Sequence, residues 1–308
     1  MDASYDAAEA VKALEMRREI EMVNERCKHV SALTNEEGWE ANVEILRVSH
    51  PNSWRMVKGT AGGTRENEAE EYQIHIQGIL EDKRLPPIRG DNNSHKKRQH
   101  LRQSVTLSGC TSAKFLLDVE HIMDIIAHFT RHVPGIQQTA VRMVGDKTVI
   151  EIGNRIFTPR LEAPTMQSVE VDPLVDETGF IEQVSRSDAG LVYGDENVVH
   201  YGEEKTEADG TRKVLKISPQ KLHVGDIVDV GFSVMGIGKG RDVKARLVLR
   251  NITLLDARFT QAWLKAKAKN QLKVTNVGRT LTLRKRPAFD DEDDGGRKTA
   301  RIDGMDEA

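Results

Sequence analysis

The chain has 308 residues, of which 38% are hydrophobic and 30% charged, and its formal net charge is −3. This composition is typical of a globular protein, and the length predicts about two domains with tails. No run reaches the roughly 18 apolar residues of a membrane span, and residues 1–10 lack a signal-peptide pattern. Cys27 and Cys110 are too few for a disulfide framework and lack zinc-site spacing. We therefore expect an intracellular protein with no membrane partner and no metal.

The first 160 residues show the patterns of an α+β domain. Apolar residues at helical spacing predict an amphipathic amino-terminal helix over 7–30 and a core helix over 112–132. Alternation predicts strands over 42–48 and 72–80, and a Gly145-Asp146 turn separates strands predicted over 141–144 and 148–152. The amino-terminal helix is expected to cover a core or pair with another helix; a dedicated oligomerisation helix is the alternative, which leaves a homo-oligomer open.

Residues 161–283 are predicted to form a mainly β domain, a small barrel or sandwich. Short β-like segments separated by Gly, Asp and Asn turns are expected over 174–183, 190–192, 198–201, 214–217, 226–234 and 244–255. Residues 284–308 are predicted to be a disordered acidic tail that carries basic clusters.

Charge is strongly segregated along the chain. Residues 214–286 contain 16 Lys or Arg and 4 Asp, a net charge of +12. Residues 161–213 have a net charge of −9, and residues 287–308 have −5. Such asymmetry indicates either a polyanion partner or acidic and basic parts that bind each other.

The last predicted strand has a cationic face. Val243, Ala245, Leu247 and Leu249 alternate with Lys244, Arg246, Val248 and Arg250, and the period of two commits the aliphatic residues to a core. We therefore expect Lys244, Arg246 and Arg250 to face solvent as a phosphate track, joined by residues of the following segment, Lys265, Lys267 and Lys269. A smaller group of cations, His95 to Arg102, is interpreted mainly as a solvated loop or helix face, with a basic patch as the alternative.

The sequence contains no recognisable catalytic or metal-binding motif. His128 and His132 are four residues apart, but no Glu follows His128, so a zinc-peptidase site is not predicted. The glycine-rich stretch 236–240 lacks both nucleotide-binding spacings and is interpreted as a hairpin turn. The sequence therefore favours a non-enzymatic protein without a cofactor.

Two resemblances follow from particular segments. The block VGDIVDVGFSV, residues 224–234, followed by KARLVLRNITLLD, residues 244–256, resembles a block in uncharacterised proteins of mushroom-forming fungi. The resemblance implies a fungal source and a β module, and it transfers no activity. Gly225-Asp226 entering one strand, with a later amphipathic strand, also resembles oligonucleotide-binding (OB) barrels.

The tail carries two basic clusters separated by an acidic linker, residues 287–296. Arg284, Lys285 and Arg286 form the first cluster, and Arg297 and Lys298 form the second. This spacing resembles a bipartite nuclear import signal, so the expected location is the nucleus and an import receptor is an expected partner, with the cytoplasm as the alternative.

Three functions remain open at this point. The preferred one is nucleic-acid binding, including single strands, through the basic β surface, with the acidic tail modulating binding. A structural or scaffold module whose acidic and basic segments pair is the alternative. An enzyme of unrecognised type is the third.

Overall fold

The computed structural model describes residues 1, 4–23, 29–59, 69–88, 95–133, 135–239 and 242–275. Met1–Lys267 form one compact unit, and Ala268–Ala308 form a second. The tail clusters at 284–286 and 297–298 lie outside the described residues.

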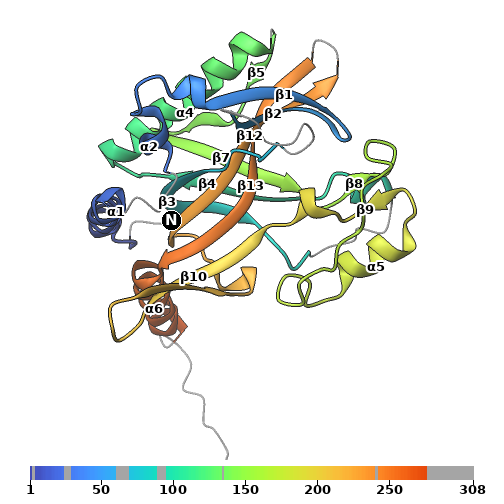
Figure 1. Ribbon diagram of the computed structural model, residues 1–308. Helices are drawn as coiled ribbons and strands as arrows, with labels where there is room; N and C mark the ends of the chain where they lie inside the picture. Colours follow the sequence, from blue (N-terminus) through green and yellow to red (C-terminus); the bar gives the residue numbers. More distant parts are fainter. Residues whose placement is uncertain are drawn as a thin grey trace, which may run out of the picture. The chain divides into compact units, whose positions relative to one another are not determined.

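The described residues form helices and a large set of strands (Figure 1). The helices are α1 (Ala7–Val23), α2 (Val30–Thr34), α3 (His95–Arg98), α4 (Ala113–His132), α5 (Phe180–Ser187) and α6 (Arg258–Thr275), with 3₁₀ turns η1 (Trp39–Asn42), η2 (Asp195–Asn197) and η3 (Pro219–Lys221). The strands are β1 (Val43–Ser49), β2 (Asn52–Lys58), β3 (Ile74–Arg84), β4 (Arg102–Ser108), β5 (Gln137–Gln138), β6 (Val141–Val144), β7 (Lys147–Arg155), β8 (Thr158–Pro159), β9 (Leu191–Val192), β10 (His200–Thr206), β11 (Arg212–Lys216), β12 (Ile227–Lys239) and β13 (Asp242–Asp256).

One mixed sheet organises the first unit. Its main order is β11-β10-β13-β12-β3-β4-β7-β6, while β2 pairs with β1 and β12, and β5 pairs with β13. Figure 1 shows β12 and β13 side by side along their length, with the β1–β2 hairpin near one end. The β10–β13 and β5–β13 pairs are parallel, whereas the other pairs of this sheet are antiparallel.

The gap between β7 and β13 is bridged by polar side chains. Asn154 of β7 donates through Nδ2 to the Leu249 carbonyl of β13 (3.3 Å) and to the Glu196 carbonyl of η2 (2.7 Å). Gln103 of β4 donates to the Asn197 carbonyl (2.9 Å) and accepts from the Tyr201 hydroxyl (2.7 Å). Because these amides are buried and paired, η2 links two strands that no backbone ladder joins.

Helix α4 covers the main core. Ser112 caps its amino terminus by accepting from the Phe115 amide, as expected of an N-cap serine. The apolar stripe of the helix, which includes Phe115, Ile122, Ile126 and Phe129, is buried against the sheet. Smaller clusters join α1 to the start of α6 and α5 to the β8–β9 pair.

A β-bulge in β13 decides where its cations lie. Gly231 pairs with Asn251 and Phe232 with Leu249, so Arg250 is the extra residue. Before the bulge, odd-numbered residues such as Val243 and Leu249 are buried, whereas beyond it Ile252 and Leu254 are buried instead. The alternation expected over 243–250, which placed Arg250 on the outward face, therefore fails at Arg250.

The structure agrees with some of the sequence-based expectations and differs from others. The α+β character with a β-rich part is confirmed. The division expected at residue 160 falls inside the first unit, because β12 pairs directly with β3. The strand expected over 174–183 is wrong: Phe180, Ile181 and Val184 have helical spacing and lie on α5. Strands β2 and β4 were not anticipated. Within the described residues, no helix combines the length and apolarity required to cross a membrane.

Candidate functional site

A cleft of about 290 Å³ is lined by residues of β4 and β7, by the end of β3 and by the first half of β13. We call it the arginine cleft because Arg84, Arg102 and Arg246 line it. The complete lining is Arg84, His100, Leu101, Arg102, Ser104, Thr139, Ala140, Glu151, Gly153, Arg246 and Leu247. The cleft therefore collects cations from the neighbouring strands β3 and β4 and from β13, which is distant from them in the sequence.

Strand register explains how these residues meet. Arg84 ends β3 opposite Ser104 of β4, and Ser104 lies opposite Gly153 of β7. A Cβ atom on Gly153 would lie 2.8 Å from the Ser104 Cβ and 3.1 Å from the Gln103 carbonyl oxygen. Glycine thus allows β4 and β7 to approach closely and leaves this part of the cleft without a side chain.

The positive charges of the cleft are incompletely compensated. Burial lowers the pKa of Arg102, and the nearby charges of Arg246 and Arg155 lower it further, against a smaller opposing effect of Glu151. Arginine nevertheless stays protonated at neutral pH. The part of this shift that comes from Arg246 and Arg155 reflects neighbouring positive charge, which a bound anion would counter.

The cleft arginines also have no side-chain partners among the described residues. Within the part of the chain that the structure describes, the side chains of Arg84, Arg102 and Arg246 form no hydrogen bond or ion pair. By contrast, Arg155 contacts Glu162 at 2.6 Å, and Glu151 contacts Arg142 at 3.6 Å. The donors of three guanidinium groups are consequently available to a ligand.

Two of the predicted binding residues lie on the first half of β13. Arg246 is half-buried in the arginine cleft. Lys244 has a side chain that is 38% exposed, with its Nζ 3.7 Å from Asp242 Oδ1. Both remain accessible, as the alternation of residues 243–249 requires.

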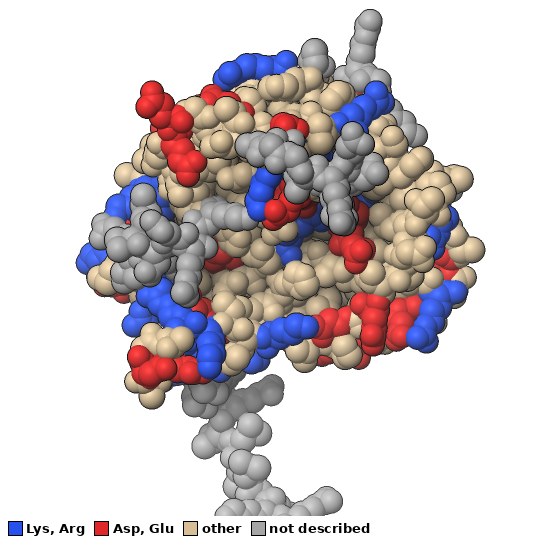
Figure 2. Space-filling model, viewed as in Figure 1, with Lys and Arg blue, Asp and Glu red and all other residues tan. Residues whose placement is uncertain are grey.

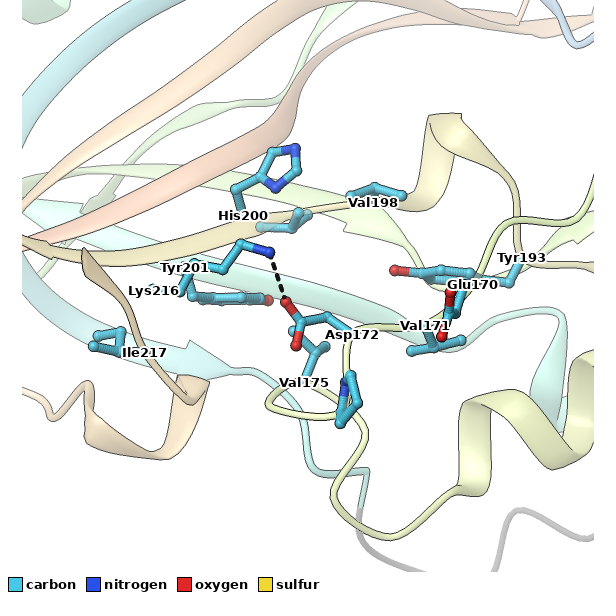
Figure 3. Close-up of a pocket in the computed structure, with 12 residues that line it drawn as sticks. Glu170, Val171, Asp172, Val175, Tyr193, Val198, His200, Tyr201, Lys216 and Ile217 are labelled. Carbon is cyan, nitrogen blue, oxygen red and sulfur yellow. Dashed lines mark hydrogen bonds and ion pairs between the residues drawn. The ribbon is translucent and has the colours of Figure 1, made fainter. Parts of the chain in front are cut away.

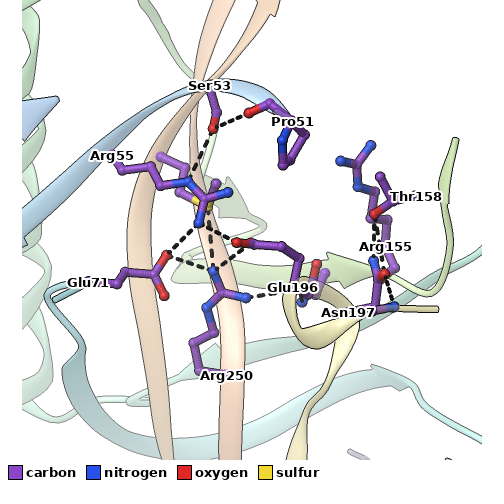
Figure 4. Close-up of polar contacts among 12 residues, drawn as sticks. Pro51, Ser53, Arg55, Glu71, Arg155, Thr158, Glu196, Asn197 and Arg250 are labelled. Atoms are coloured by element: carbon purple, nitrogen blue, oxygen red, sulfur yellow. Dashed lines mark hydrogen bonds and ion pairs between the residues drawn. The ribbon is translucent and has the colours of Figure 1, made fainter. Parts of the chain in front are cut away.

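Arg250, predicted to face solvent, is instead buried (Figure 4). Its Nη2 donates to Glu71 Oε1 (2.6 Å) and lies 3.3 Å from Glu196 Oε2, and its Nη1 donates to the Glu196 carbonyl (2.9 Å). Arg55 contacts the same two carboxylates. We call Arg55, Glu71, Glu196 and Arg250 the buried charge network. The prediction of an exposed Arg250 is wrong because two carboxylates from other segments cover this side of β13.

The predicted lysines of the following segment lie on α6. Lys265 and Lys267 are exposed, and the Lys267 ammonium lies 5.2 Å from the centre of the Trp263 ring. Helix α6 begins after Asp256, and an extended strand separates Asp256 from Arg246 by roughly 33 Å. A continuous track from Arg246 through Arg250 to these lysines is therefore not formed. Lys269 is exposed and belongs to the second unit.

Sequence reasoning missed two arginines of the cleft as binding residues. Arg102 was noted only within a group of surface cations, and Arg84 was not singled out. The order of the strands could have indicated both residues. Arg84 ends β3 and Arg102 begins β4, so the two cations lie at the same end of an antiparallel pair.

The charge segregation of the sequence does not persist as separate surfaces on the face drawn in Figure 2, where basic and acidic residues are interspersed. Acidic residues of 161–213 pair with cations from elsewhere in the chain and from the same segment. Glu204 contacts Arg17 and Arg212, and Asp172 contacts Lys216.

The described residues contain no group of three or more His, Cys, Asp or Glu side chains suited to hold a metal ion. His128 and His132 have ring centres 4.7 Å apart, and His128 also lies against Trp39 at 5.2 Å. Burial and the neighbouring His132 and Arg131 lower the pKa of His128. These histidines therefore belong to a ring cluster beside the core.

Comparison with known proteins gives structural neighbours only. No family model and no curated protein matches the chain. Among solved structures, the chain is similar to gp2.5, a single-stranded DNA-binding protein of bacteriophage T7, at 9% identity and a TM-score of 0.29, over 60% of this chain and 86% of that one. It is also similar to the C-terminally truncated single-stranded DNA-binding protein of bacteriophage Enc34, at 8% identity and a TM-score of 0.34, over 63% of this chain and 93% of that one. The same Enc34 protein in complex with single-stranded DNA is similar at 9% identity and a TM-score of 0.32, over 63% of this chain and 92% of that one.

Proposed function

We propose that this protein binds single-stranded nucleic acid, with phosphate groups held in the arginine cleft. The observation that carries the proposal is the convergence of Arg84, Arg102 and Arg246 on one cleft without side-chain partners in the described part of the chain. Guanidinium groups donate in a planar fork that matches phosphate oxygens. A polyanion would supply the missing acceptors and reduce the repulsion that lowers the pKa of Arg102.

Strand topology supports the same site. We infer that β3, β4, β7, β12 and β13 correspond to the five strands of an OB-type barrel, because β3 pairs with both β4 and β12, β4 pairs with β7, and β12 pairs with β13. OB folds bind oligonucleotides or oligosaccharides on the face of their second and third strands and on two adjoining loops. The arginine cleft lies on β4 and β7, and His100 and Leu101 come from the loop before β4. Its arginines favour polyanions over neutral sugars.

The size of the cleft favours a single strand. A hollow of about 290 Å³ is comparable with the lower limit of small-ligand pockets, which are roughly 300–1,000 Å³. It can hold one nucleotide-sized group at a time, and a duplex would contact only its rim. Large aromatic residues are absent from the lining, so affinity is expected to come mainly from phosphates.

The test is a salt-titrated binding assay with single-stranded DNA, duplex DNA and RNA. Arg102→Ala and Arg246→Ala should each weaken single-strand binding across sequences and lower the salt slope by about 0.7 per lost phosphate contact. Arg186→Ala is the matched control, because Arg186 is 78% exposed on α5 and pairs only with Glu182 among the described residues. If both cleft variants bind as the control does, the proposal is wrong.

A scaffold function is the second candidate, and it is favoured by internal pairing. Glu203, Glu204 and Glu207 contact Lys221, Arg212 and Lys213, respectively. The buried charge network joins four separate segments. Under this alternative, nucleic acid would bind weakly and the cleft variants would leave that binding unchanged. The same salt titration therefore separates the two candidates.

We further propose nuclear import through the two basic clusters of the tail. The basis is the sequence alone, since Arg284, Lys285, Arg286, Arg297 and Lys298 lie outside the described residues. A fluorescent fusion should accumulate in nuclei, and neutralising these five residues should redistribute it to the cytoplasm. Unchanged nuclear accumulation of the neutralised variant would contradict the proposal.

A further inference from the structure

A second hollow, of about 380 Å³, lies between the segment 170–175, the start of β10 and the end of β11 (Figure 3). We call it the tyrosine pocket because Tyr193 and Tyr201 line it. It shares no lining residue with the arginine cleft. A ligand in this pocket is therefore not part of the phosphate contacts proposed above.

The floor of the tyrosine pocket is apolar. Val175, Val199, Tyr201 and Ile217 line it, and none of them is more than 8% exposed. The Tyr201 hydroxyl is directed elsewhere, because it donates to Gln103 Oε1 at 2.7 Å. The floor thus offers aliphatic groups and one ring face, which suit an apolar body.

One polar group faces this apolar space without a partner. Tyr193 is 4% exposed, and Figure 3 shows its hydroxyl pointing into the pocket between Val198 and Asp172. No hydrogen bond to this hydroxyl is formed by the described residues. Burial, followed by the charges of Asp172 and Asp176, raises the pKa of Tyr193 to about 12, so the phenol is neutral at pH 7. The hydroxyl is therefore open to the hollow, where a ligand can supply a hydrogen-bond partner.

The mouth of the pocket is acidic. Asp172 Oδ2 lies 3.2 Å from Lys216 Nζ, and this pair is charge-balanced. Glu170 also lines the mouth, is exposed, and forms no ion pair within the described part of the chain. The negative potential near Tyr193 repels carboxylates and phosphates and attracts cations.

We propose that the tyrosine pocket binds a small organic cation, whose apolar body packs on Val175, Val199 and Ile217 and whose ammonium group lies between Glu170 and the Tyr193 hydroxyl. The phenol oxygen accepts a hydrogen bond from the ammonium group, and Glu170 supplies the countercharge. The apolar body excludes water from both contacts, which strengthens them relative to exposed pairs.

The experiment uses the full chain with tyramine as the probe, and para-hydroxyphenylacetate as an anionic probe of similar size. In titrations followed by amide NMR, tyramine should shift residues of 170–175, 193–201 and 216–217, and the anion should bind at least tenfold more weakly. Equal binding of the two probes, or no binding of tyramine at millimolar concentration, would overturn the proposal.

Two variants and one control locate the contacts. Tyr193→Phe keeps the ring and should weaken tyramine binding by roughly three- to tenfold, the effect of one lost hydrogen bond. Glu170→Gln lies at an exposed position and should reduce the preference for tyramine over the anion. Tyr72→Phe, a half-buried tyrosine outside the pocket, should change neither. Unaltered tyramine affinity in both pocket variants would assign the binding to another site.

This outcome is independent of the nucleic-acid proposal. Tyr193→Phe and Glu170→Gln should leave single-stranded DNA binding unchanged, whereas Arg102→Ala should leave tyramine binding unchanged. Loss of both activities in a variant whose melting temperature is normal would contradict the separation of the two sites.

Discussion

Two arginines of one strand, Arg246 and Arg250, have opposite environments although they are four residues apart. Arg246 lies in the arginine cleft without a side-chain partner among the described residues. Arg250 is 8% exposed and is held by Glu71 and Glu196. Burial alone would lower the pKa of Arg250, but the two carboxylates outweigh it and raise the pKa above its ordinary value. For Arg102 in the cleft, burial and neighbouring arginines act in the same direction and lower the pKa.

A cation in a basic segment is therefore available to a ligand only if the fold leaves it without an acidic partner. Glu71 precedes β3 and Glu196 lies on η2, so both partners of Arg250 come from distant segments. No such carboxylate reaches Arg246 within the described residues; Glu151, the acidic residue of the cleft, pairs with Arg142. Arg250 therefore stabilises the fold, whereas Arg246 is available to a ligand.

The largest expected effect distinguishes these two arginines by stability. Arg250→Ala removes one partner of a buried network and leaves Glu71 and Glu196 undercompensated, so the free energy of unfolding should fall by about 3–5 kcal/mol. Arg246→Ala should change it by no more than about 0.5 kcal/mol, because no pair is lost. Urea unfolding of both variants measures the difference. Similar losses of unfolding free energy in the two variants would contradict the proposed difference between Arg246 and Arg250.

A smaller effect is expected from the acidic tail. Deleting residues 287–308 removes a net charge of −5, which under the proposed function would compete with nucleic acid for accessible cations. We expect up to about tenfold tighter binding of single-stranded DNA at low salt, with the gain disappearing as ionic strength rises. The gain should also disappear when Arg102 and Arg246 are both changed to Ala. Equal or weaker binding by the shortened chain would argue against competition by the tail.

The smallest effect concerns pH and the buried charge network. Burial would raise the pKa of Glu196, but the hydrogen bond and charge of Arg55 and the charge of Arg250 lower it below its ordinary value. A carboxyl group whose pKa is depressed by folding stabilises above its unfolded pKa, near 4.5, and this contribution is lost as pH falls through the folded pKa.

The unfolding free energy should therefore decline below pH 4.5 by about 1 kcal/mol more in the wild-type protein than in Glu196→Gln. Unfolding curves at pH 7 and pH 3 measure this difference. Glu151→Gln serves as the control from the cleft and should keep the wild-type pH dependence. Parallel pH profiles for wild type and Glu196→Gln would show that the network does not act through this carboxylate.

Local sequence patterns were sufficient to predict the helices and strands whose buried face is apolar. Helix α4 was predicted because its apolar stripe is continuous, β6 and β7 because they flank the Gly145-Asp146 turn, and the first half of β13 because its residues alternate. The same alternation correctly placed Lys244 and Arg246 away from the core. The charge count of residues 214–286 showed that this segment is rich in cations, which is the origin of the nucleic-acid hypothesis.

Strands that bury polar groups could not be predicted from apolar periodicity. In β4, Gln103 occupies an inward position, and in β2, Arg55 is buried against Glu196. Polar residues at buried positions break the apolar period, and their partners lie at η2, more than ninety residues further on for Gln103. Only the folded chain supplies those partners, so only the fold explains their burial.

The sequence by itself determined the helices and strands with regular apolar periods, the basic character of residues 214–286 and the outward direction of Arg246. Tertiary structure decided that β3 and β12 belong to one sheet across the expected domain boundary, that a bulge and two distant carboxylates bury Arg250, and that Arg84 and Arg102 join Arg246 in one cleft. The physical reason is that periodicity reports which side of an element is apolar, whereas strand pairing, bulges and ion pairs depend on segments far away in the chain.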